Sequence, residues 1–150
     1  MNDAIVTAAR GWLGTRFHHQ GRRKKSDAHA GGVDCLGLLV GVADELALRS
    51  ATGVPLTALD ETDYAHLPDI QRLRQKLSEV LRPVTENDVQ PGDVGLFEID
   101  GRAQHLAIFG RIDNTLSLIH AYAPARCVVE HGFDENWRQK LVCAFCVVTE

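Results

Sequence analysis

The sequence predicts an α+β fold in which N-terminal helices pack on a C-terminal antiparallel sheet of about five strands. Two observations favour this fold class. Apolar residues recur at helical spacing up to about residue 81, and after Pro83 they alternate in short runs that turn residues separate. The chain has 150 residues, of which 45% are hydrophobic, so its length and composition suit a single domain spanning residues 1–150.

Three segments of the N-terminal half have the pattern of amphipathic helices. The first covers about residues 3–13 and ends at Gly14. The second starts after Asp34, an N-cap residue type, and its apolar positions extend to Leu46 around most of the circumference, which predicts a buried central helix. The third ends before Pro83, and its apolar positions are Ile70, Leu73, Leu77, Val80 and Leu81.

Residues 14–32 separate the first two helices and have no apolar face. The segment is rich in Gly, His, Arg and Lys, and it contains the consecutive residues Arg22, Arg23, Lys24 and Lys25. We expect an exposed basic loop here, and a solvated surface is the favoured interpretation. Contact with the carboxylates of an anionic substrate or partner is the alternative.

After residue 83, five short runs rich in Val, Ile, Leu and Phe predict strands, with turn residues between them. The predicted strands cover residues 93–99, 104–110, 115–122, 126–131 and 141–149. The last one includes Cys143 and Cys146, whose spacing also occurs in zinc and redox sites. A buried strand is favoured, because no second Cys or His pair accompanies them at a suitable spacing.

Charge, hydropathy and cysteine content exclude several classes of function. Sixteen Lys and Arg residues against twenty Asp and Glu residues give a formal net charge of −4, so nucleic acid is not an expected partner. No stretch approaches the ~20 apolar residues of a membrane span, and the N-terminus lacks the pattern of a signal peptide, so we expect synthesis in the cytoplasm. The four cysteines are expected to be reduced, and the seven histidines have no recognised metal-ligand spacing, so no metal or other cofactor is expected.

Cys35 is the strongest candidate for a catalytic residue. It follows Asp34 in the first turn of the central helix, where free N–H groups and the positive end of the helix dipole stabilise a thiolate. A cysteine in this place is a candidate nucleophile. Taken alone, a small apolar residue at the start of a core helix is the commoner interpretation, so the decision depends on its partners.

His105 and His120 lie on consecutive predicted strands. If residues 111–114 form a four-residue turn, Gly110 pairs with Thr115 and the two histidines lie directly opposite each other. Opposed side chains share a face at roughly 4.5–5.5 Å between Cβ atoms, close enough for one ring to hydrogen-bond the other. The rest of that face is apolar, so we expect it to pack on the central helix.

A thiol at a helix start, an imidazole on the facing sheet and a second polar group beside it form the arrangement of cysteine peptidases. Cys35 would attack a carbonyl, with its own backbone N–H as an oxyanion donor. His105 would accept the thiol proton and later protonate the leaving amine. His120 would fix the tautomer and orientation of His105. For each histidine alone, a hydrogen-bonded, half-buried side chain is the alternative.

Other residues are not assigned to a site. His66 and His131 lie beside polar residues and are interpreted as surface or turn residues. Phe133 and Trp137 are interpreted as core residues rather than as a platform on which sugars stack.

Four segments of the chain resemble the sequence motifs of a known family. Residues 32–38 read Gly-Val-Asp-Cys-Leu-Gly-Leu, residues 90–97 contain Pro-Gly-Asp, residues 105–109 read His-Leu-Ala-Ile-Phe, and residues 118–121 read Leu-Ile-His-Ala. In this order they resemble the nucleophile motif, the start of a strand, the segment with the catalytic histidine and the segment with the third polar residue of NlpC/P60 cysteine peptidases. That family consists of cell-wall hydrolases with a rearranged papain-like core, and the resemblance covers nearly the whole chain.

The resemblance implies a papain-like fold and an endopeptidase that acts on peptidoglycan stem peptides without a metal, typically between D-γ-glutamate and a diamino acid. Leu36 after the nucleophile, residues 15–20 and the small size resemble most the branch of phage tails and gene transfer particles. That branch implies tail or baseplate proteins as partners. It also implies action at the cell wall as part of a released phage-like particle, which supplies a route to the wall for a protein without a signal peptide.

The resemblance also implies a substrate site that includes Phe17, His19, Gln20 and Asp34. The family usually has a tyrosine where this chain has Phe17, which cannot donate a hydrogen bond. Either that donor is dispensable, or His18, His19 or Gln20 replaces it, or catalysis is slow. Two other functions stay open: a tail or baseplate component that keeps the fold for docking, and an amidase or acyltransferase with the same triad.

Overall fold

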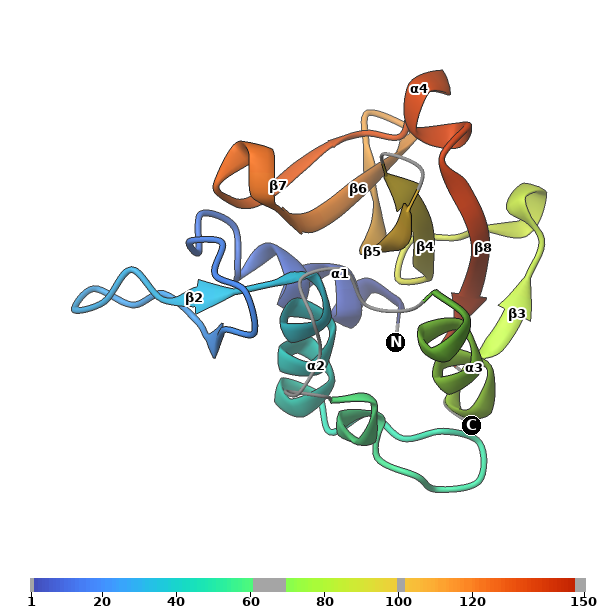
Figure 1. Cartoon of the computed structure of the whole chain (residues 1–150), viewed down its shortest axis with the longest axis horizontal. Coiled ribbons are helices and arrows are strands. Elements are labelled where there is room, and N and C mark those ends of the chain that lie inside the picture. The colour runs from blue at the N-terminus through green and yellow to red at the C-terminus, as the bar shows by residue number, and fades with distance from the viewer. Residues whose placement is uncertain (1, 61–69, 100–101, 148–150) are drawn as a thin grey trace.

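The computed structural model describes residues 2–60, 70–99 and 102–147, and it has the predicted α+β fold (Figure 1). Its helices are α1 (Asn2–Arg10), α2 (Cys35–Glu45), α3 (Ile70–Val80) and the short α4 (Glu135–Arg138). Its strands are β1 (Arg22–Arg23), β2 (Gly32–Val33), β3 (Arg82–Val84), β4 (Val94–Ile99), β5 (Arg102–Ile112), β6 (Thr115–Tyr122), β7 (Cys127–Gly132) and β8 (Leu141–Cys146).

Six antiparallel strands form the main sheet, in the order β3-β8-β4-β5-β6-β7. The five predicted strands are confirmed as β4 to β8, although residues 148 and 149 of the last one lie outside the described residues. The sequence does not predict the sixth strand, β3, which has three residues and contains Pro83. Proline is tolerated there because β3 is an edge strand, with a neighbour on one side only.

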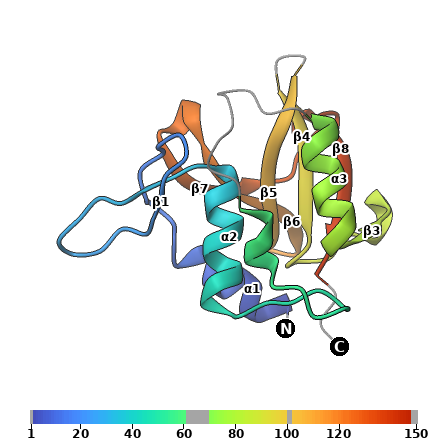
Figure 2. The ribbon, with the colours of Figure 1, turned by 60° about the horizontal axis from the view of Figure 1, so that its bottom comes forward.

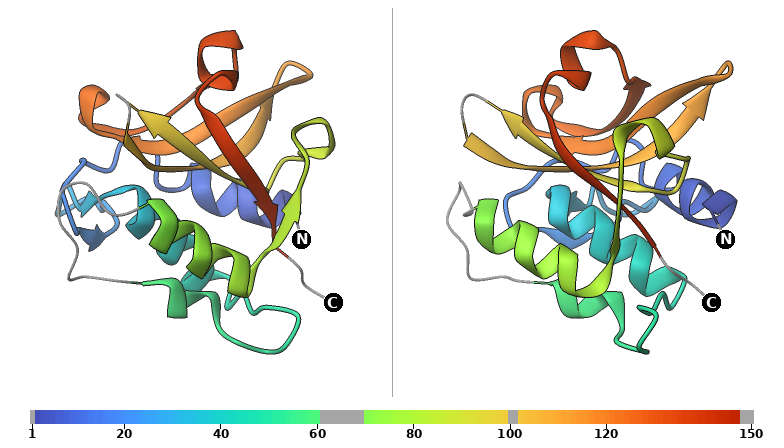
Figure 3. Two further views of the ribbon diagram at one scale, coloured as in Figure 1. Left: turned by 45° about the vertical axis from the view of Figure 1, so that its right-hand side comes forward. Right: turned by 90° about the vertical axis from the view of Figure 1, so that its right-hand side faces the viewer.

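Helices lie on both faces of the sheet (Figure 3), and each face carries an apolar core. On one face lie α1, α2 and α3, which pack against residues such as Leu106, Ile108 and Ile119. On the other face lies α4 with an aromatic core, whose main members are Phe97, Phe109, Leu118, Phe133 and Trp137. The prediction that Phe133 and Trp137 are core residues is confirmed.

The helices begin and end close to their sequence signals. α1 stops at Arg10 rather than at residue 13. The chain then continues in turns to Gly14, whose φ is +86°. α2 contains Gly41 where the indole of Trp12 packs on it, and a Cβ at this position would collide with that ring. Within the described residues, no helix is both long and apolar enough to cross a bilayer.

The basic segment between α1 and α2 forms a small two-stranded sheet, β1 with β2, and its hairpin projects beyond α2 (Figure 2). Arg23 and Lys25 are exposed, as predicted for a solvated loop. Lys24 forms an ion pair of 2.9 Å with Glu45, and Arg22 is half-buried and bonded to two carboxylates. The prediction of an exposed basic loop is therefore wrong at Arg22.

The turn between β5 and β6 is shorter than predicted. Asp113 and Asn114 form a two-residue turn with φ values of 49° and 69°, a left-handed conformation that Asp and Asn tolerate better than most residues. Gly110 therefore pairs with Ser117 rather than with Thr115. The predicted register is wrong by two residues, but a shift of two keeps every side chain on its face of the sheet. The two candidate histidines thus become diagonal neighbours instead of opposed ones.

Candidate active site

Cys35 is the first residue of α2, and the residue before it fixes the start of the helix. Asp34 has an extended backbone with φ −105° and ψ −174°, and its side chain accepts a hydrogen bond of 2.8 Å from the backbone N–H of Gly37. This N-cap satisfies one of the N–H groups that the first helical turn leaves unpaired. The thiol therefore stands at the positive end of the helix dipole, as the sequence predicts.

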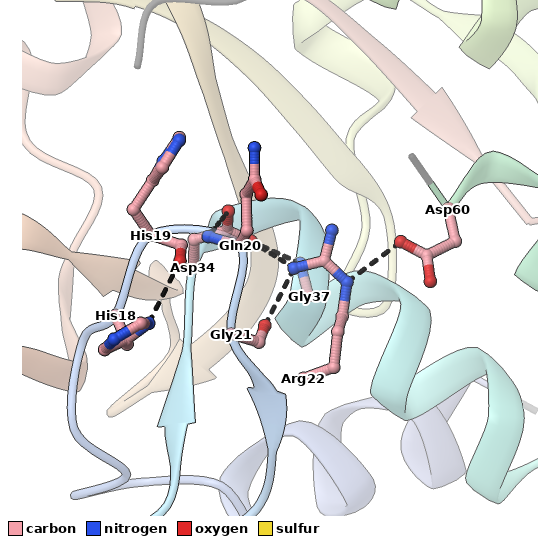
Figure 4. Close-up of polar contacts among 8 residues, drawn as sticks. All are labelled: His18, His19, Gln20, Gly21, Arg22, Asp34, Gly37 and Asp60. Carbon is pink, nitrogen blue, oxygen red and sulfur yellow. Dashed lines mark hydrogen bonds and ion pairs between the residues drawn. The ribbon is translucent and has the colours of Figure 1, made fainter. Parts of the chain in front are cut away.

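The Asp34 carboxylate also holds the loop in front of α2 (Figure 4). Its Oδ2 accepts the backbone N–H of Gln20 at 2.9 Å, and its Oδ1 accepts Nη1 of Arg22 at 2.9 Å. Arg22 in turn donates to the carbonyl of Gly21 at 2.7 Å and to Asp60 at 2.9 Å. Only 5% of Asp34 is exposed, so its carboxylate is occupied by internal donors. Direct contact of Asp34 with a substrate stays a prediction.

Gly37 lets this loop lie directly on α2. A Cβ at position 37 would collide with the carbonyl oxygen of Gly21 and with the side chain of Val33. Gly37 stands two residues after Cys35, so the close contact holds the loop against the same helical turn that carries the thiol. Close packing of the loop on α2 therefore explains why the Asp-Cys-Leu-Gly segment has a glycine at position 37.

The thiol of Cys35 lies where α2 meets the first half of β5. The backbone N–H groups of Leu36 and Leu106 face the sulfur, and Leu106 directly follows His105 in the chain. Burial, together with the negative charge of Asp34, raises the pKa of the thiol to about 12, against the lowering effect of these N–H groups. The sequence predicts an activated thiolate, and this is wrong for the free protein, because burial outweighs the helix dipole.

Three histidines form a line of hydrogen bonds across β5, β6 and β7. Nε2 of His105 lies 2.5 Å from Nδ1 of His120, and Nε2 of His120 lies 2.8 Å from Nε2 of His131. Nδ1 of His131 lies 3.0 Å from the carbonyl oxygen of Gly132. The fold therefore brings the two predicted histidines together and adds a third one.

The histidine line lies on the face of the sheet that points away from α2. Side chains alternate along β5, so Leu106 points to the helices whereas His105 shares its face with the aromatic core. Trp137, on α4, packs against the line, with ring centroids 6.1, 5.1 and 5.3 Å from those of His105, His120 and His131. The prediction that this face packs on the central helix is wrong. The interface with α2 is filled by the residues that alternate with the histidines along β5 and β6, such as Leu106 and Ile119.

Burial keeps two of the imidazoles neutral. It is the main reason that the pKa of His105 is lowered to about 4, and repulsion between protonated His105 and protonated His131 adds to the effect. The pKa of His120 is lowered to about 2, by burial first and then by repulsion from His105 and His131 when those rings are protonated. Near neutral pH both rings are uncharged, so His105 is able to accept a proton from a thiol.

The lowered pKa values predict a loss of stability in acid. Histidines of the unfolded chain protonate near pH 6.5, whereas the folded protein keeps both rings neutral well below that pH. The unfolded state then binds more protons, so the free energy of unfolding is highest above pH 6.5 and falls as the pH drops towards 4. We expect a loss of about 1.4 kcal/mol per pH unit for each ring.

Urea unfolding between about pH 7.5 and 4.5 measures this loss. The double variant His105→Gln, His120→Gln has neither ring and is expected to show a flatter pH dependence. If its slope equals that of the wild type, the two imidazoles are not the source of the acid sensitivity.

The other residues of the predicted substrate site lie on the segment that leads into β1. Phe17 is half-buried, its side chain packs against the main core, and its backbone N–H donates to the carbonyl of Arg126 at 2.8 Å. His19 and Gln20 are also half-buried, and their side chains extend to the same side of the loop (Figure 4). Gln20 has a left-handed backbone with φ 61°. A role of these residues in substrate binding stays a prediction.

His131 is not the surface or turn residue that its polar neighbours in the sequence suggest. The pairing of β6 with β7 places His120 opposite Val129, and His131, two residues farther along β7, shares that face. With the predicted strands 115–122 and 126–131, the register reasoning that joins the first two histidines pairs His120 with Val128 and puts His131 on the opposite face. His131 joins the other two histidines because β7 starts at Cys127, which pairs with Tyr122. His66, which the sequence assigns to the same class, lies outside the described residues.

Among the described residues, the other candidate side chains form neither a metal-binding group nor a disulfide. Within residues 2–60, 70–99 and 102–147, no group of three His, Cys, Asp or Glu side chains could hold a metal ion. None of the four cysteines, which all lie in these ranges, is in a disulfide. Cys143 and Cys146 lie on β8, so the strand predicted for this segment is confirmed.

No family model matches the sequence, and no curated protein is similar to it. Solved structures do share its fold. An NlpC/P60 family protein from Bacillus cereus is similar with a TM-score of 0.65 and 16% identity, over 99% of this chain and 41% of that chain. The NlpC/P60 domain of the peptidoglycan hydrolase SagA is similar with a TM-score of 0.60 and 19% identity, over 97% of each chain.

An N-acetylmuramoyl-L-alanine amidase from Bacteroides uniformis is similar as well, with a TM-score of 0.56 and 13% identity over 96% of each chain. The chain thus spans about two fifths of the Bacillus protein and nearly all of the other two. At these identities the likeness shows the fold, which this chain shares with NlpC/P60 proteins.

Proposed function

We propose that this protein is a cysteine endopeptidase that hydrolyses amide bonds in the stem peptides of cell-wall peptidoglycan. One observation carries the proposal: the Cys35 thiol, at the start of α2, faces the backbone N–H of Leu106, and the residue before Leu106 in the chain is His105, which is neutral and hydrogen-bonded to His120. A thiol, a neutral base and an orienting polar group are the parts of a nucleophilic amide hydrolase. The fold shared with the SagA domain, which is named as part of a peptidoglycan hydrolase, supports the substrate class.

In this proposal the reaction has two halves. Sγ of Cys35 attacks the scissile carbonyl carbon while His105 accepts the thiol proton, and the C–N bond breaks as His105 gives that proton to the leaving amine. Water then attacks the thioester and gives a proton to His105, which returns it to the departing sulfur. His120 orients His105 throughout, and the backbone N–H of Cys35 at the helix start is the proposed oxyanion donor.

The bond and the route to the wall are proposed from the sequence resemblance. We expect cleavage between D-γ-glutamate and a diamino acid such as meso-diaminopimelate. Leu36 after the nucleophile and the segment at residues 15–20 support the branch carried by phage-like tails. On that basis the partners are tail or baseplate proteins, and the protein acts at the wall as part of a particle released by lysis.

Mass spectrometry of the fragments released from purified diaminopimelate-type peptidoglycan tests the proposed activity. The wild type is compared with Cys35→Ala and with Cys127→Ala, a matched control that removes a half-buried thiol on β7. We expect fragments ending in γ-glutamate from the wild type and the control, and none from Cys35→Ala. Release of whole stem peptides that begin with L-alanine would instead indicate an amidase, the activity named for the Bacteroides structure.

Two outcomes contradict the proposal. One is equal release by Cys35→Ala and the wild type, and the other is no release by a wild type that unfolds cooperatively. The second outcome favours a tail or baseplate component that keeps the fold for docking. The observations behind that second candidate are the half-buried thiol, with a pKa of about 12, and Phe17 in place of the family's tyrosine.

A further inference from the structure

His131 stands at the outer end of the histidine line and has no part in the proposed chemistry. Its backbone pairs with Leu118 of β6, and its ring is half-buried beside Trp137. Both of its ring nitrogens have partners. Nε2 lies 2.8 Å from Nε2 of His120, and Nδ1 lies 3.0 Å from the carbonyl oxygen of Gly132.

The carbonyl of Gly132 sets the direction of every hydrogen bond in the line. A carbonyl oxygen only accepts, so Nδ1 of His131 must carry hydrogen. In a neutral ring Nε2 is then an acceptor, which requires Nε2 of His120 to donate. By the same rule Nδ1 of His120 accepts and Nε2 of His105 donates. Nδ1 of His105 is therefore the ring nitrogen whose lone pair is able to accept a proton.

We propose that His131, anchored on the Gly132 carbonyl, is a positioning residue that fixes the tautomers of His120 and His105 and so makes Nδ1 of His105 the base for Cys35. This inference rests on the proposed function. Without an acceptor at position 131, His120 is able to donate from Nδ1 instead. Nδ1 of His105 would then carry hydrogen, and the ring could not accept the thiol proton in that tautomer.

The surroundings make the tautomer, rather than the charge, the property that must be controlled. Burial lowers the pKa of both His105 and His120, so both rings stay neutral near physiological pH. His120 is 0% exposed, so water does not replace its hydrogen-bond partners. Trp137 packs against all three rings, and Tyr122 stacks on His120 with centroids 5.0 Å apart. Each ring is thus held in the orientation that the line requires.

NMR of protein with ¹⁵N-labelled histidine tests this inference, because protonated and unprotonated ring nitrogens resonate far apart. In the wild type at about pH 7 we expect hydrogen on Nε2 of His105 and His120 and on Nδ1 of His131. In His131→Leu we expect hydrogen to shift to Nδ1 of His105, and kcat to fall about tenfold or more with KM nearly unchanged. In His131→Gln the side-chain carbonyl can accept from His120, and we expect it to restore both the spectrum and kcat.

The inference is overturned if wild-type His105 carries its hydrogen on Nδ1, or if His131→Leu leaves the tautomers of His105 and His120 unchanged. The wild-type spectrum needs no variant, so it decides the matter even where His131→Leu does not fold. If the expected tautomers are found in a protein that releases no peptidoglycan fragments, the proposed function fails while the role of His131 in fixing the tautomers stands.

Discussion

Replacing His105 by glutamine is expected to lower kcat/KM for stem-peptide hydrolysis by about 10³-fold. The thiol of Cys35 has a pKa of about 12, so near pH 7 only about one molecule in 10⁵ holds a thiolate. The base therefore has to remove the proton during the attack, whereas an enzyme with a preformed thiolate depends less on its base. Glutamine is able to hydrogen-bond His120 but cannot accept a proton, so the substitution isolates the chemical role of the imidazole.

The pH dependence of kcat/KM on a soluble muropeptide checks this expectation. The wild-type rate should fall as the pH drops through about 4, where His105 becomes protonated. The residual rate of His105→Gln should rise about tenfold per pH unit through the neutral range, because only the thiolate reacts. His29→Gln, a change at an exposed histidine in the loop between β1 and β2, serves as the control and should match the wild type. A folded His105→Gln with wild-type kcat/KM would show that His105 is not the base.

Asp34→Ala is expected to lower the free energy of unfolding by about 3–5 kcal/mol. The substitution removes the cap of α2, and it leaves the guanidinium of Arg22, whose side chain is only 20% exposed, without its more buried carboxylate. It also removes the acceptor of the Gln20 N–H, which ties the loop to the turn that carries Cys35. Stability and hydrolysis should therefore fall together, even where Asp34 does not touch the substrate.

Two matched variants separate the contributions in urea unfolding. Asp34→Asn keeps an acceptor for the N–H of Gly37 but loses the charge, so we expect a loss of roughly 2 kcal/mol. Asp60 is the other partner of Arg22, and the side chain of Asp60 is 33% exposed. Asp60→Asn should therefore lower the free energy of unfolding by about 1 kcal/mol or less. Equal losses for Asp60→Asn and Asp34→Ala would place the stabilisation in the outer ion pair and contradict the role given to the cap.

Local patterns were enough to predict much of the architecture. The alternating run that became β6 has the bounds Thr115–Tyr122 in both the sequence and the structure, because a period of two and the flanking turn residues are properties of neighbouring positions. The start of α2 at Cys35 was predictable for the same reason, since Asp34 caps the helix within its own turn. The edge strand β3 was not, because only its pairing with β8 makes three residues around a proline a strand.

What the sequence by itself determined is the fold class, the start of the central helix and the fact that His105 and His120 share one face of the sheet. Only the tertiary structure decided the rest of the site. The two-residue turn changed the register, the third strand added His131, and burial between α2 and β5 raised the pKa of the Cys35 thiol to about 12. Periodicity and capping act over a few residues of one segment. Register, burial and hydrogen-bond partners depend on segments far apart in the chain, and folding alone sets the distances and the solvent access between them.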